Sequence, residues 1–405
     1  MSKNSNLGVA KTAKNDEFYT QLSDIEKELK HYRSHFSDKI VLCNCDDPFE
    51  SNFFKYFVLN FNRLGLKKLI ATCYYSSPIV GQQLYCYFDK SGQMRLSYGD
   101  EISNNTNPKR NPKRPYKAIV TSVHDTTGDG GIDMVDVAKL FMSGENKLTE
   151  LEGNGDFRSD ECLKLLDEAD IVVTNPPFSL FREYIATLMQ HNKKFVVIGN
   201  QNAITYKEIF SFIMKNQLWL GSTSPKEFVV PAEIANRNNT YVREDGATIA
   251  KFGNVCWFTN LDLKKRHEEM ILINYYNTDK YYHFDNYDAI NVDKISDIPQ
   301  DYSGIMGVPI TFLDKYNPSQ FEIVGYTAKD MGVDCLKFYK DLEQSMDGKP
   351  FVRNMKSARF SPMISVSERP KKTCYRASNA NGYLLKTYGR VLLRNKHPEP
   401  PKEVK

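Results

Sequence analysis

Lys39-Ile-Val-Leu-Cys-Asn44 is a short apolar run that predicts a buried strand, and Leu66-Lys-Lys-Leu-Ile-Ala-Thr-Cys-Tyr-Tyr75 predicts a second strand. Between the two, Ser51 is a residue type that caps helices and Gly65 is one that ends them. The helix that they bound carries its large apolar residues on one face: Phe53, Phe54, Phe57, Val58 and Phe61. Strand, helix and strand in this order predict the βαβ unit of a parallel sheet, and hence an α/β fold.

The same alternation continues on both sides of this unit. Before it, Leu22, Ile25, Leu29, Tyr32 and Phe36 recur every three or four residues, which predicts an amphipathic helix from about residue 20 to 36. After it, apolar runs predict strands of the same sheet at residues 171–174, 194–199 and 254–260. Ser179 is the expected cap of the helix between the first two of these strands.

Four regions follow from where this alternation stops and resumes. A chain of 405 residues is longer than one hydrophobic core usually serves, so more than one domain is expected. Residues 1–75 hold the first βαβ unit, and residues 76–152 are polar, which indicates an insertion with a hairpin near residues 82–97. Residues 153–267 complete the α/β domain, and residues 268–405 form a second domain of mixed structure.

Composition excludes several protein classes. Apolar residues make up 41% of the chain and charged residues 26%, as in ordinary globular proteins. The mean hydropathy is −0.51, and no run approaches the roughly 20 apolar residues that cross a bilayer. The N-terminus lacks the apolar core of an export signal, and the eight cysteines and seven histidines show no metal-ligand spacing. We therefore expect a cytoplasmic protein with neither a metal site nor a membrane anchor.

The net charge of +4 conceals an uneven distribution. Residues 351–405 contain 13 Lys and Arg against 3 Asp and Glu, a net charge of +10, whereas the other 350 residues contain 41 against 47, a net charge of −6. A second basic cluster, Asn107-Pro-Lys-Arg-Asn-Pro-Lys-Arg-Pro-Tyr-Lys117, has five positive charges. Basic segments on an acidic body suit a polyanionic partner, although a solvated basic tail has the same composition.

The stretch Ile171-Val-Val-Thr-Asn-Pro-Pro-Phe178 carries the clearest chemistry. Ligands of open α/β sheets bind at the carboxyl ends of the strands, where this motif is expected. Pro176 and Pro177 lack backbone donors, which leaves nearby oxygens free to accept hydrogen bonds. The amide oxygen of Asn175 and the carbonyl of Pro176 can therefore accept hydrogen bonds from both hydrogens of a substrate amino group. Phe178 offers a face on which a planar ring can stack. A plain turn after a core strand is the competing interpretation, and the flanking Asn and Phe favour a catalytic role.

This motif resembles the (Asp/Asn/Ser)-Pro-Pro-(Tyr/Phe) signature of amino-directed methyltransferases that use S-adenosylmethionine. DNA adenine, RNA base and protein glutamine methyltransferases share that signature. Further segments resemble the EcoRI-type DNA adenine methyltransferases in sequence and in order, over most of the chain between about residues 16 and 322. These segments are Asp16-Glu-Phe-Tyr-Thr-Gln21, Cys43-Asn-Cys-Asp-Asp-Pro48, Ser51-Asn-Phe-Phe-Lys-Tyr-Phe57, Gly155-Asp-Phe-Arg158, Asn175-Pro-Pro-Phe-Ser-Leu-Phe181 and Met306-Gly-Val-Pro-Ile-Thr-Phe312.

The resemblance implies a Rossmann-like methyltransferase sheet followed by a C-terminal target-recognition domain of mixed structure. It implies that Asn175, Pro176, Pro177 and Phe178 form the catalytic motif, and that Asp156 bonds the adenine amino group of the cofactor. The segment 43–48 lacks the glycines of most cofactor loops, a departure that the EcoRI type shares. The residues implied to bind S-adenosylmethionine are Asp16, Phe18, Tyr19, Thr20, Cys43, Asn44, Asp46, Asp156, Phe157 and Asn175.

The implied reaction transfers a methyl group from S-adenosylmethionine to the exocyclic amino group of an adenine flipped out of double-stranded DNA, without a covalent enzyme intermediate. The resemblance also implies a monomer that serves restriction-modification beside an endonuclease, without a stable complex between the two. The alternatives are an RNA adenine or protein glutamine methyltransferase, and a non-catalytic DNA-binding protein on a methyltransferase fold.

Basic and aromatic residues are the candidates for DNA contact. In the C-terminal segment, Lys and Arg interleave with Tyr375, Tyr383 and Tyr388, a pattern typical of phosphate contact. Residue type does not distinguish an Arg that contacts a base from one that contacts a phosphate. Trp257 is at least as compatible with a buried core position as with base stacking. The candidates are Trp257, Lys109, Arg110, Lys113, Arg114, Arg369, Lys371, Lys372, Arg376 and Arg390.

Overall fold

The chain forms two compact units, Met1–Ile204 with Leu220–Asp262 and Thr205–Trp219 with Leu263–Lys405. The longer part of the second unit begins at Leu263, whereas the sequence predicts a domain boundary at residue 268 and assigns residues 205–219 to the α/β domain. Among the described helices, none is both long and apolar enough to cross a membrane. The computed structural model describes residues 19–45, 51–73, 84–88, 94–98, 115–141, 144–230, 239–244, 246–353 and 360–400.

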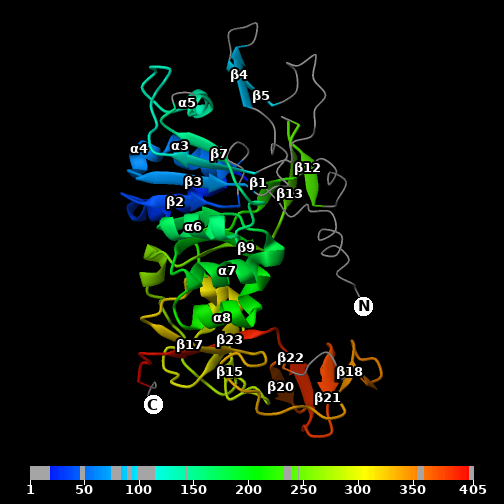
Figure 1. Ribbon diagram of the computed structural model, residues 1–405. Coiled ribbons are helices and arrows are strands. Elements are labelled where there is room, and N and C mark those ends of the chain that lie inside the picture. Colours follow the sequence, from blue (N-terminus) through cyan, green and yellow to red (C-terminus); the bar gives the residue numbers. More distant parts are fainter. Residues whose placement is uncertain are drawn as a thin grey trace. The chain divides into compact units, whose positions relative to one another are not determined.

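An eight-stranded mixed sheet forms the centre of the first unit, which confirms the expected α/β fold (Figure 1). Strands β9, β8, β2 and β3 pair in parallel, whereas the pairs β14–β9, β3–β6 and β6–β7 are antiparallel. The strands in spatial order are β10 (Trp219–Leu220), β14 (Val255–Thr259), β9 (Lys194–Asn200), β8 (Ile171–Thr174), β2 (Ile40–Cys43), β3 (Lys68–Thr72), β6 (Tyr116–Val120) and β7 (Lys147–Glu150).

The first βαβ unit follows the sequence prediction closely. Helix α3 (Asn52–Leu59) begins after Ser51, whose hydroxyl accepts hydrogen bonds from the backbone N–H groups of Phe53 (3.1 Å) and Phe54 (3.3 Å). A short continuation, α4 (Phe61–Leu64), ends at Gly65, which has the left-handed φ of 63° that favours glycine. All the apolar residues predicted on this helix face are buried.

The second βαβ unit contains one difference from the prediction. Residues Phe178–Leu180 wind as a 3-10 turn, η2, in which the N–H of Leu180 donates to the carbonyl of Pro177 (3.0 Å). Helix α7 (Phe181–Gln190) therefore begins after Leu180 and has no side-chain cap. The prediction that Ser179 caps this helix is wrong because Ser179 is already inside the 3-10 turn.

Two further helical segments belong to the first unit. The predicted amphipathic helix is α2 (Leu22–Leu29) followed by the 3-10 helix η1 (Lys30–His35), and it buries Ile25, Leu29, Tyr32 and Phe36 completely. Helix α6 (Asp160–Glu168) begins after Ser159, whose hydroxyl accepts from the N–H of Cys162 (3.3 Å).

Residues expected within a polar insertion contribute to the main sheet. Strands β4 (Leu84–Phe88) and β5 (Met94–Tyr98) pair as the expected antiparallel hairpin. Beyond the hairpin, β6 extends the large sheet beside β3, and β7 forms its edge after helix α5 (Met134–Lys139). Three of the four residues of β7 are exposed, so this edge strand has no apolar run by which a sequence could announce it.

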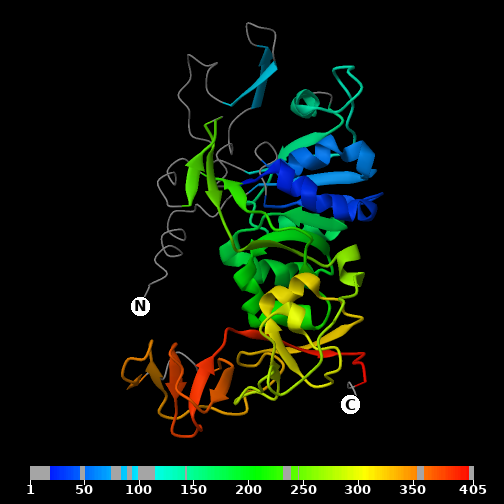
Figure 2. The same ribbon diagram turned by 180° about the vertical axis from the view of Figure 1, so that it is seen from behind.

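A small antiparallel sheet brings the N-terminal segment together with the loop between β10 and β14. Its strands in order are β1 (Tyr19–Thr20), β11 (Glu227–Val229), β13 (Thr248–Lys251) and β12 (Thr240–Val242). Figure 2 shows the green strands of this sheet beside the large sheet rather than within it.

The buried carboxylate of Glu28 anchors this loop to α2. Glu28 is 0% exposed, and it accepts hydrogen bonds from the hydroxyl of Tyr32 (2.7 Å), the N–H of Ser222 (2.8 Å), and the N–H (2.7 Å) and hydroxyl (2.6 Å) of Thr223. Burial and the adjacent carboxylate hold the pKa of Tyr32 far above its usual value, so its hydroxyl remains a donor. Four donors thus satisfy a carboxylate that water cannot reach.

The second unit contains two sheets and helix α8 (Lys207–Met214). The strands of the first sheet are β15 (Ile290–Asn291), β16 (Met306–Pro309), β23 (Arg390–Asn395) and β17 (Phe321–Tyr326). Those of the second are β19 (Val352–Arg353), β18 (Glu343–Ser345), β21 (Cys374–Arg376), β22 (Tyr383–Lys386) and β20 (Met363–Val366). Among the described residues, further 3-10 helices are η3 (Gln201–Thr205), η5 (Lys264–His267), η6 (Ile295–Asp297) and η7 (Ile310–Lys315).

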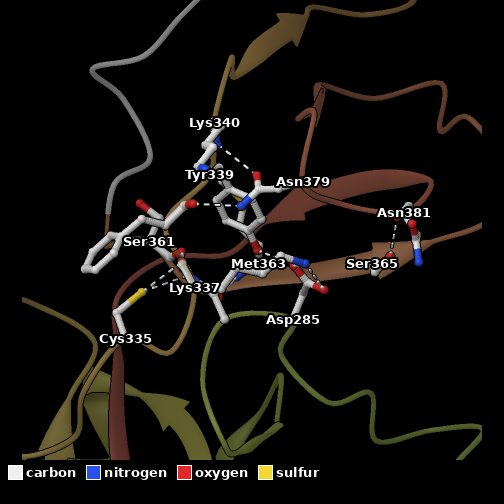
Figure 3. A network of polar contacts seen from close by, with 12 residues as sticks. Asp285, Cys335, Lys337, Tyr339, Lys340, Ser361, Met363, Ser365, Asn379 and Asn381 are labelled. Carbon is white, nitrogen blue, oxygen red and sulfur yellow. Dashed lines mark hydrogen bonds and ion pairs between the residues drawn. The ribbon is translucent and has the colours of Figure 1, made fainter.

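Asp285 and Asn286 bind segments of the second of these sheets, and Figure 3 shows Asp285 with Lys337 and Tyr339. The carboxylate of Asp285 accepts from the hydroxyl of Tyr339 (2.8 Å) and pairs with the ammonium group of Lys337 (2.9 Å). The side chain of Asn286 is completely buried, and its oxygen accepts from the N–H of Met363 (2.9 Å), where β20 begins. One short segment therefore binds both the chain that leads into β18 and the start of β20.

We predict that Glu28→Gln lowers the free energy of unfolding by about 1–3 kcal/mol, because an amide NH2 would face donors that now meet an acceptor. Thermal or urea unfolding of the full chain measures the change. Glu26→Gln is the matched control, since Glu26 lies exposed on the same helix, and it should change stability by less than about 0.5 kcal/mol. Equal stability of the two variants would contradict the role assigned to Glu28.

Candidate active site

The carboxyl ends of β2 and β8 lie side by side in the large sheet. Val41 is paired with Ile171 and Leu42 with Val172, so the segments that follow Cys43 and Thr174 emerge at the same edge. From β2 the chain crosses over to β3 on one side, and from β8 it crosses over to β9 on the other. Strand ends at which the crossovers diverge in this way leave a crevice, which is where open α/β sheets bind ligands.

Asn44, directly after β2, ties this edge together. Its side chain is 4% exposed, and its amide oxygen accepts a hydrogen bond from the hydroxyl of Tyr184 on α7. Its backbone carbonyl accepts from the hydroxyl of Thr72 at the end of β3 (3.2 Å). The end of β2 is therefore held both to the neighbouring strand and to the helix that follows the Asn-Pro-Pro-Phe motif.

The Asn-Pro-Pro-Phe motif occupies the turn between β8 and α7. Thr174 is completely buried as the last strand residue, and Pro176 is buried after it. Asn175, Pro177 and Phe178 are half-buried, so their side chains lie at the boundary between the core and the edge of the sheet. The structure thus places the predicted catalytic residues on one short turn at the carboxyl edge.

Asp156 and Phe157 lie next to α7 and close to Asn44. The ring of Phe157 is 6% exposed and packs edge-on against the ring of Tyr184, with the centroids 5.0 Å apart. Gly155 before them has a φ of 76°, a left-handed conformation that glycine adopts without strain. The tyrosine that bonds Asn44 therefore also packs on Phe157, which joins two of the predicted cofactor segments.

Arg158 stabilises the ionised form of Asp156. Its guanidinium donates to both oxygens of Asp156, at 2.8 Å from Nε and 2.6 Å from Nη2. Its Nη1 lies 3.2 Å from each carboxylate oxygen of Glu183 on α7. These hydrogen bonds hold the pKa of Asp156 below its ordinary value and raise the pKa of Arg158, so both groups stay charged at neutral pH.

The N-terminal segment contributes a buried hydroxyl. Thr20 is 3% exposed, and its carbonyl accepts from the side-chain amide of Asn52 at the start of α3 (2.7 Å). Within the part of the chain that the structure describes, the hydroxyl of Thr20 has no hydrogen-bond partner. A buried hydroxyl of this kind is suited to a polar group of a ligand.

Other predicted cofactor residues differ in how far the structure describes them. The backbone of Tyr19 pairs with Val229 in the small sheet. Cys43 is completely buried in β2, so the structure places its thiol in the core of the sheet. Asp16, Phe18 and Asp46 lie outside the described residues.

The structure corrects two of the predicted DNA contacts. Trp257 is 0% exposed and packs edge-on against Phe53 (5.9 Å between ring centroids), so it is a core residue of β14. Arg390 is 7% exposed, and its guanidinium donates to Asn291 (3.2 Å) and Asp293 (3.4 Å). Burial lowers the pKa of Arg390. Neither side chain is accessible to a nucleic acid.

The remaining basic candidates differ in their environments. Arg369 donates to the carbonyl of Lys349 (2.8 Å) and lies over the ring of Phe351, and Arg376 pairs with Glu343. Lys371 and Lys372 are exposed, and within the described residues they form no ion pair. The other candidates, which are Lys109, Arg110, Lys113 and Arg114, lie outside the described residues.

Sequence reasoning missed three residues of this site. In the sequence, Arg158 is named only as part of a motif, and no role is assigned to Glu183 or Tyr184. Two of their contacts join separate segments: Tyr184 lies 140 residues from Asn44, and Glu183 lies 25 residues from Arg158. The position of Glu183 and Tyr184 on α7, just after the motif, was the available signal.

Comparisons with known proteins identify relatives of this chain. The family model described as adenine-specific methyltransferase EcoRI matches residues 6–396. The Type II methyltransferase M.EcoRI of Escherichia coli is 44% identical over 339 residues, which cover 81% of this chain and 92% of that protein. M.MgeORF184P of Mycoplasma genitalium is 38% identical with 81% and 88% covered, and M.MpnI of Mycoplasma pneumoniae is 35% identical with 89% and 97% covered. No solved structure gives a significant match.

We predict that Tyr184→Phe lowers the free energy of unfolding by about 1–2 kcal/mol, because it removes the donor to a buried amide oxygen. Thermal unfolding of the full chain measures the loss. In the control Tyr241→Phe, the lost hydrogen bond to Glu227 (3.2 Å) is exposed, so the effect should stay below about 0.5 kcal/mol. A larger effect in the control than at Tyr184 would contradict the assignment.

Proposed function

The chain belongs to the adenine-specific methyltransferase EcoRI family, and on this premise we propose how its site methylates DNA. The enzyme is an adenine-specific DNA methyltransferase. We propose that it transfers the methyl group of S-adenosylmethionine to the exocyclic amino group of a single adenine, flipped out of the duplex into the crevice. The observation that carries this proposal is the Asn-Pro-Pro-Phe turn at the carboxyl end of β8, beside the end of β2.

Asn175 and Pro176 are the proposed catalytic residues. The lone pair of an adenine amino group is delocalised into the ring, which makes its nitrogen a poor nucleophile. The amide oxygen of Asn175 and the carbonyl of Pro176 each accept a hydrogen bond from the amino group, and these bonds localise the lone pair on the nitrogen. Acceptors fixed in place before the reaction act chiefly in the transition state. One proton leaves the nitrogen after methyl transfer, and no covalent enzyme intermediate is needed.

Phe178 is proposed to hold the flipped base. Flipping costs a few kcal/mol, and stacking on an aromatic ring offsets part of that cost. Phe178 is half-buried immediately after the two prolines, so its ring is fixed by the same turn that presents the acceptors. Pro177 contributes rigidity, since its ring fixes the backbone between the acceptors and the aromatic side chain.

The described residues fit S-adenosylmethionine, which supplies an electrophilic methyl group when bound. Asp156 is an ionised acceptor for an adenine amino group, and Phe157 lies beside it. Thr20 has a buried hydroxyl with no partner among the described residues, and Asn44 lies at the shared edge. The assignment of Asp16, Phe18, Tyr19, Cys43 and Asp46 to the same cofactor rests on the resemblance in sequence.

We propose a Rossmann-like catalytic domain followed by a target-recognition domain in residues 268–405. The exposed ammonium groups of Lys371 and Lys372, which lie between β20 and β21, are the proposed phosphate contacts. Arg369 and Arg376 lie over the ring of Phe351, with their guanidinium carbons 5.0 Å and 4.4 Å from its centroid. Arginines ordered in this way are suited to stack against or bond to DNA.

The proposed biological setting is restriction-modification in a bacterial cytoplasm. M.EcoRI and the two Mycoplasma relatives are named Type II methyltransferases. By analogy, the enzyme acts as a monomer and protects sites that a separate endonuclease cleaves, without forming a stable complex with it. Membership in this family does not favour the RNA, glutamine or non-catalytic alternatives.

We predict that Asn175→Ala reduces the rate of methyl transfer by at least about 10²–10³-fold, because one transition-state acceptor is lost. DNA affinity should stay close to that of the unsubstituted enzyme. Asn175→Asp keeps an oxygen acceptor and should retain measurable transfer. The assay is transfer of radiolabelled methyl groups to duplex DNA, with long-read sequencing of DNA from a host that lacks other adenine methyltransferases. Methyladenine at one recurrent short sequence is expected, and an unmodified genome despite folded protein would contradict the proposal.

We predict that the double variant Lys371→Gln/Lys372→Gln weakens DNA binding and reduces its salt dependence. Each lost phosphate contact should lower the slope of log K against log salt by about 0.9. Fluorescence anisotropy at several salt concentrations gives this slope. Lys27→Gln/Lys164→Gln removes the same charge from exposed positions of the first unit and is expected to leave the slope unchanged. An equal effect of both double variants would indicate net charge rather than contact.

A further inference from the structure

The guanidinium of Arg158 joins two carboxylates from different parts of the first unit. Nε and Nη2 donate to the two oxygens of Asp156, and Nη1 donates to Glu183 on α7. The backbone N–H of Arg158 also donates to Oδ1 of Asp156 (2.9 Å). All three guanidinium nitrogens are thereby used. A lysine could provide the charge but not this planar, two-sided geometry.

This arrangement leaves one hydrogen-bond acceptor site of the Asp156 carboxylate unused among the described residues. An ionised carboxylate offers about two acceptor sites on each oxygen. Oδ1 already accepts from the backbone N–H and from Nε, whereas Oδ2 accepts only from Nη2 among the described residues. One further donor is therefore expected at Oδ2, and an amino group of a ligand can supply it.

Two neighbouring residues of α7 contact Arg158 and Phe157, one each. Glu183 binds the guanidinium, and the next residue, Tyr184, packs on the ring of Phe157. Because α7 continues directly from the Asn-Pro-Pro-Phe turn, these contacts fix the position of Asp156 relative to Asn175.

Exposure indicates that these ion pairs orient the carboxylate rather than stabilise the fold. The side chains of Arg158 and Glu183 are 44% and 51% exposed, and pairs of this kind add little to folding stability. The side chain of Asp156 is only 20% exposed, so the direction of its remaining acceptor site is set by Arg158.

We propose that Arg158 is a positioning residue that aims Oδ2 of Asp156 at the adenine amino group of S-adenosylmethionine and holds it in register with the catalytic turn. This inference rests on the proposed function, because it takes Asp156 as the residue that recognises the cofactor adenine. It adds a specificity role for Arg158 and Glu183 that charge alone would not give.

The test compares two ligands on the full-length enzyme by calorimetry. One is S-adenosylhomocysteine, and the other is its analogue in which unsubstituted purine replaces adenine, so that the amino group alone is missing. Arg158→Lys should lower the affinity for S-adenosylhomocysteine about tenfold, as expected for a misdirected hydrogen bond to a charged group. It should change the affinity for the purine analogue by less than about twofold. Glu183→Gln should have the same selective effect at a smaller magnitude. Lys164→Gln, an exposed substitution on α6, is the control and should change neither affinity.

Two outcomes would overturn the proposal. An equal loss of affinity for both ligands in Arg158→Lys would show general damage to the pocket. No loss of affinity for either ligand would show that Arg158 does not orient Asp156. A further variant, Asp156→Ala, separates this result from the proposed function. If Asp156→Ala lowers the affinity for both ligands equally, Asp156 does not recognise the amino group and the cofactor assignment fails. If it is selective and Arg158→Lys is not, only the role of Arg158 fails.

Discussion

The parallel pairing of β2 with β8 is the interaction on which the candidate active site depends. The two strands are separated by 130 residues, yet the N–H of Ile40 donates to the carboxylate of Asp170 (2.9 Å) at the start of the pair. Their crossovers leave in opposite directions, toward β3 and toward β9. Because such crossovers are right-handed, their helices cover opposite faces of the sheet, and the carboxyl edge between the strands stays open for a ligand.

The first unit contains polar contacts of two kinds, and their burial separates their roles. Glu28 and the Asn44–Tyr184 pair are buried, so a lost partner there leaves an unsatisfied polar group and costs folding free energy. Arg158 and Glu183 are about half exposed, so water replaces a lost partner at little cost to the fold. The first kind builds the scaffold, and the second directs a carboxylate toward a ligand. The Asn44–Tyr184 pair and the Arg158–Glu183 pair both involve α7, the helix that begins just after the Asn-Pro-Pro-Phe turn.

The second unit shows why a basic composition is a poor guide to individual contacts. Of the basic candidates that the structure describes, Arg390 lies inside a sheet with Asn291 and Asp293, whereas Lys371 and Lys372 project from a connection between strands. All three contribute equally to the charge of the C-terminal segment. Trp257 illustrates the same point for aromatic residues, because its position on a fully buried strand places it in the core.

Local patterns in the sequence determined the strands β2, β3, β8, β9 and β14, the capped helix after Ser51 and its end at Gly65, because each depends on neighbouring residues, and they singled out the Asn-Pro-Pro-Phe motif. The edge strand β7 escaped prediction because its mostly exposed residues carry no apolar run, and the interior strand β6 was missed because its short apolar end lies in an otherwise polar segment. The Ser179 cap was mispredicted because a 3-10 turn precedes α7. Only the tertiary structure decided which charges are buried and that Tyr184 and Arg158 serve the site. Those contacts join segments far apart in the chain, and residue spacing carries no information about such pairings.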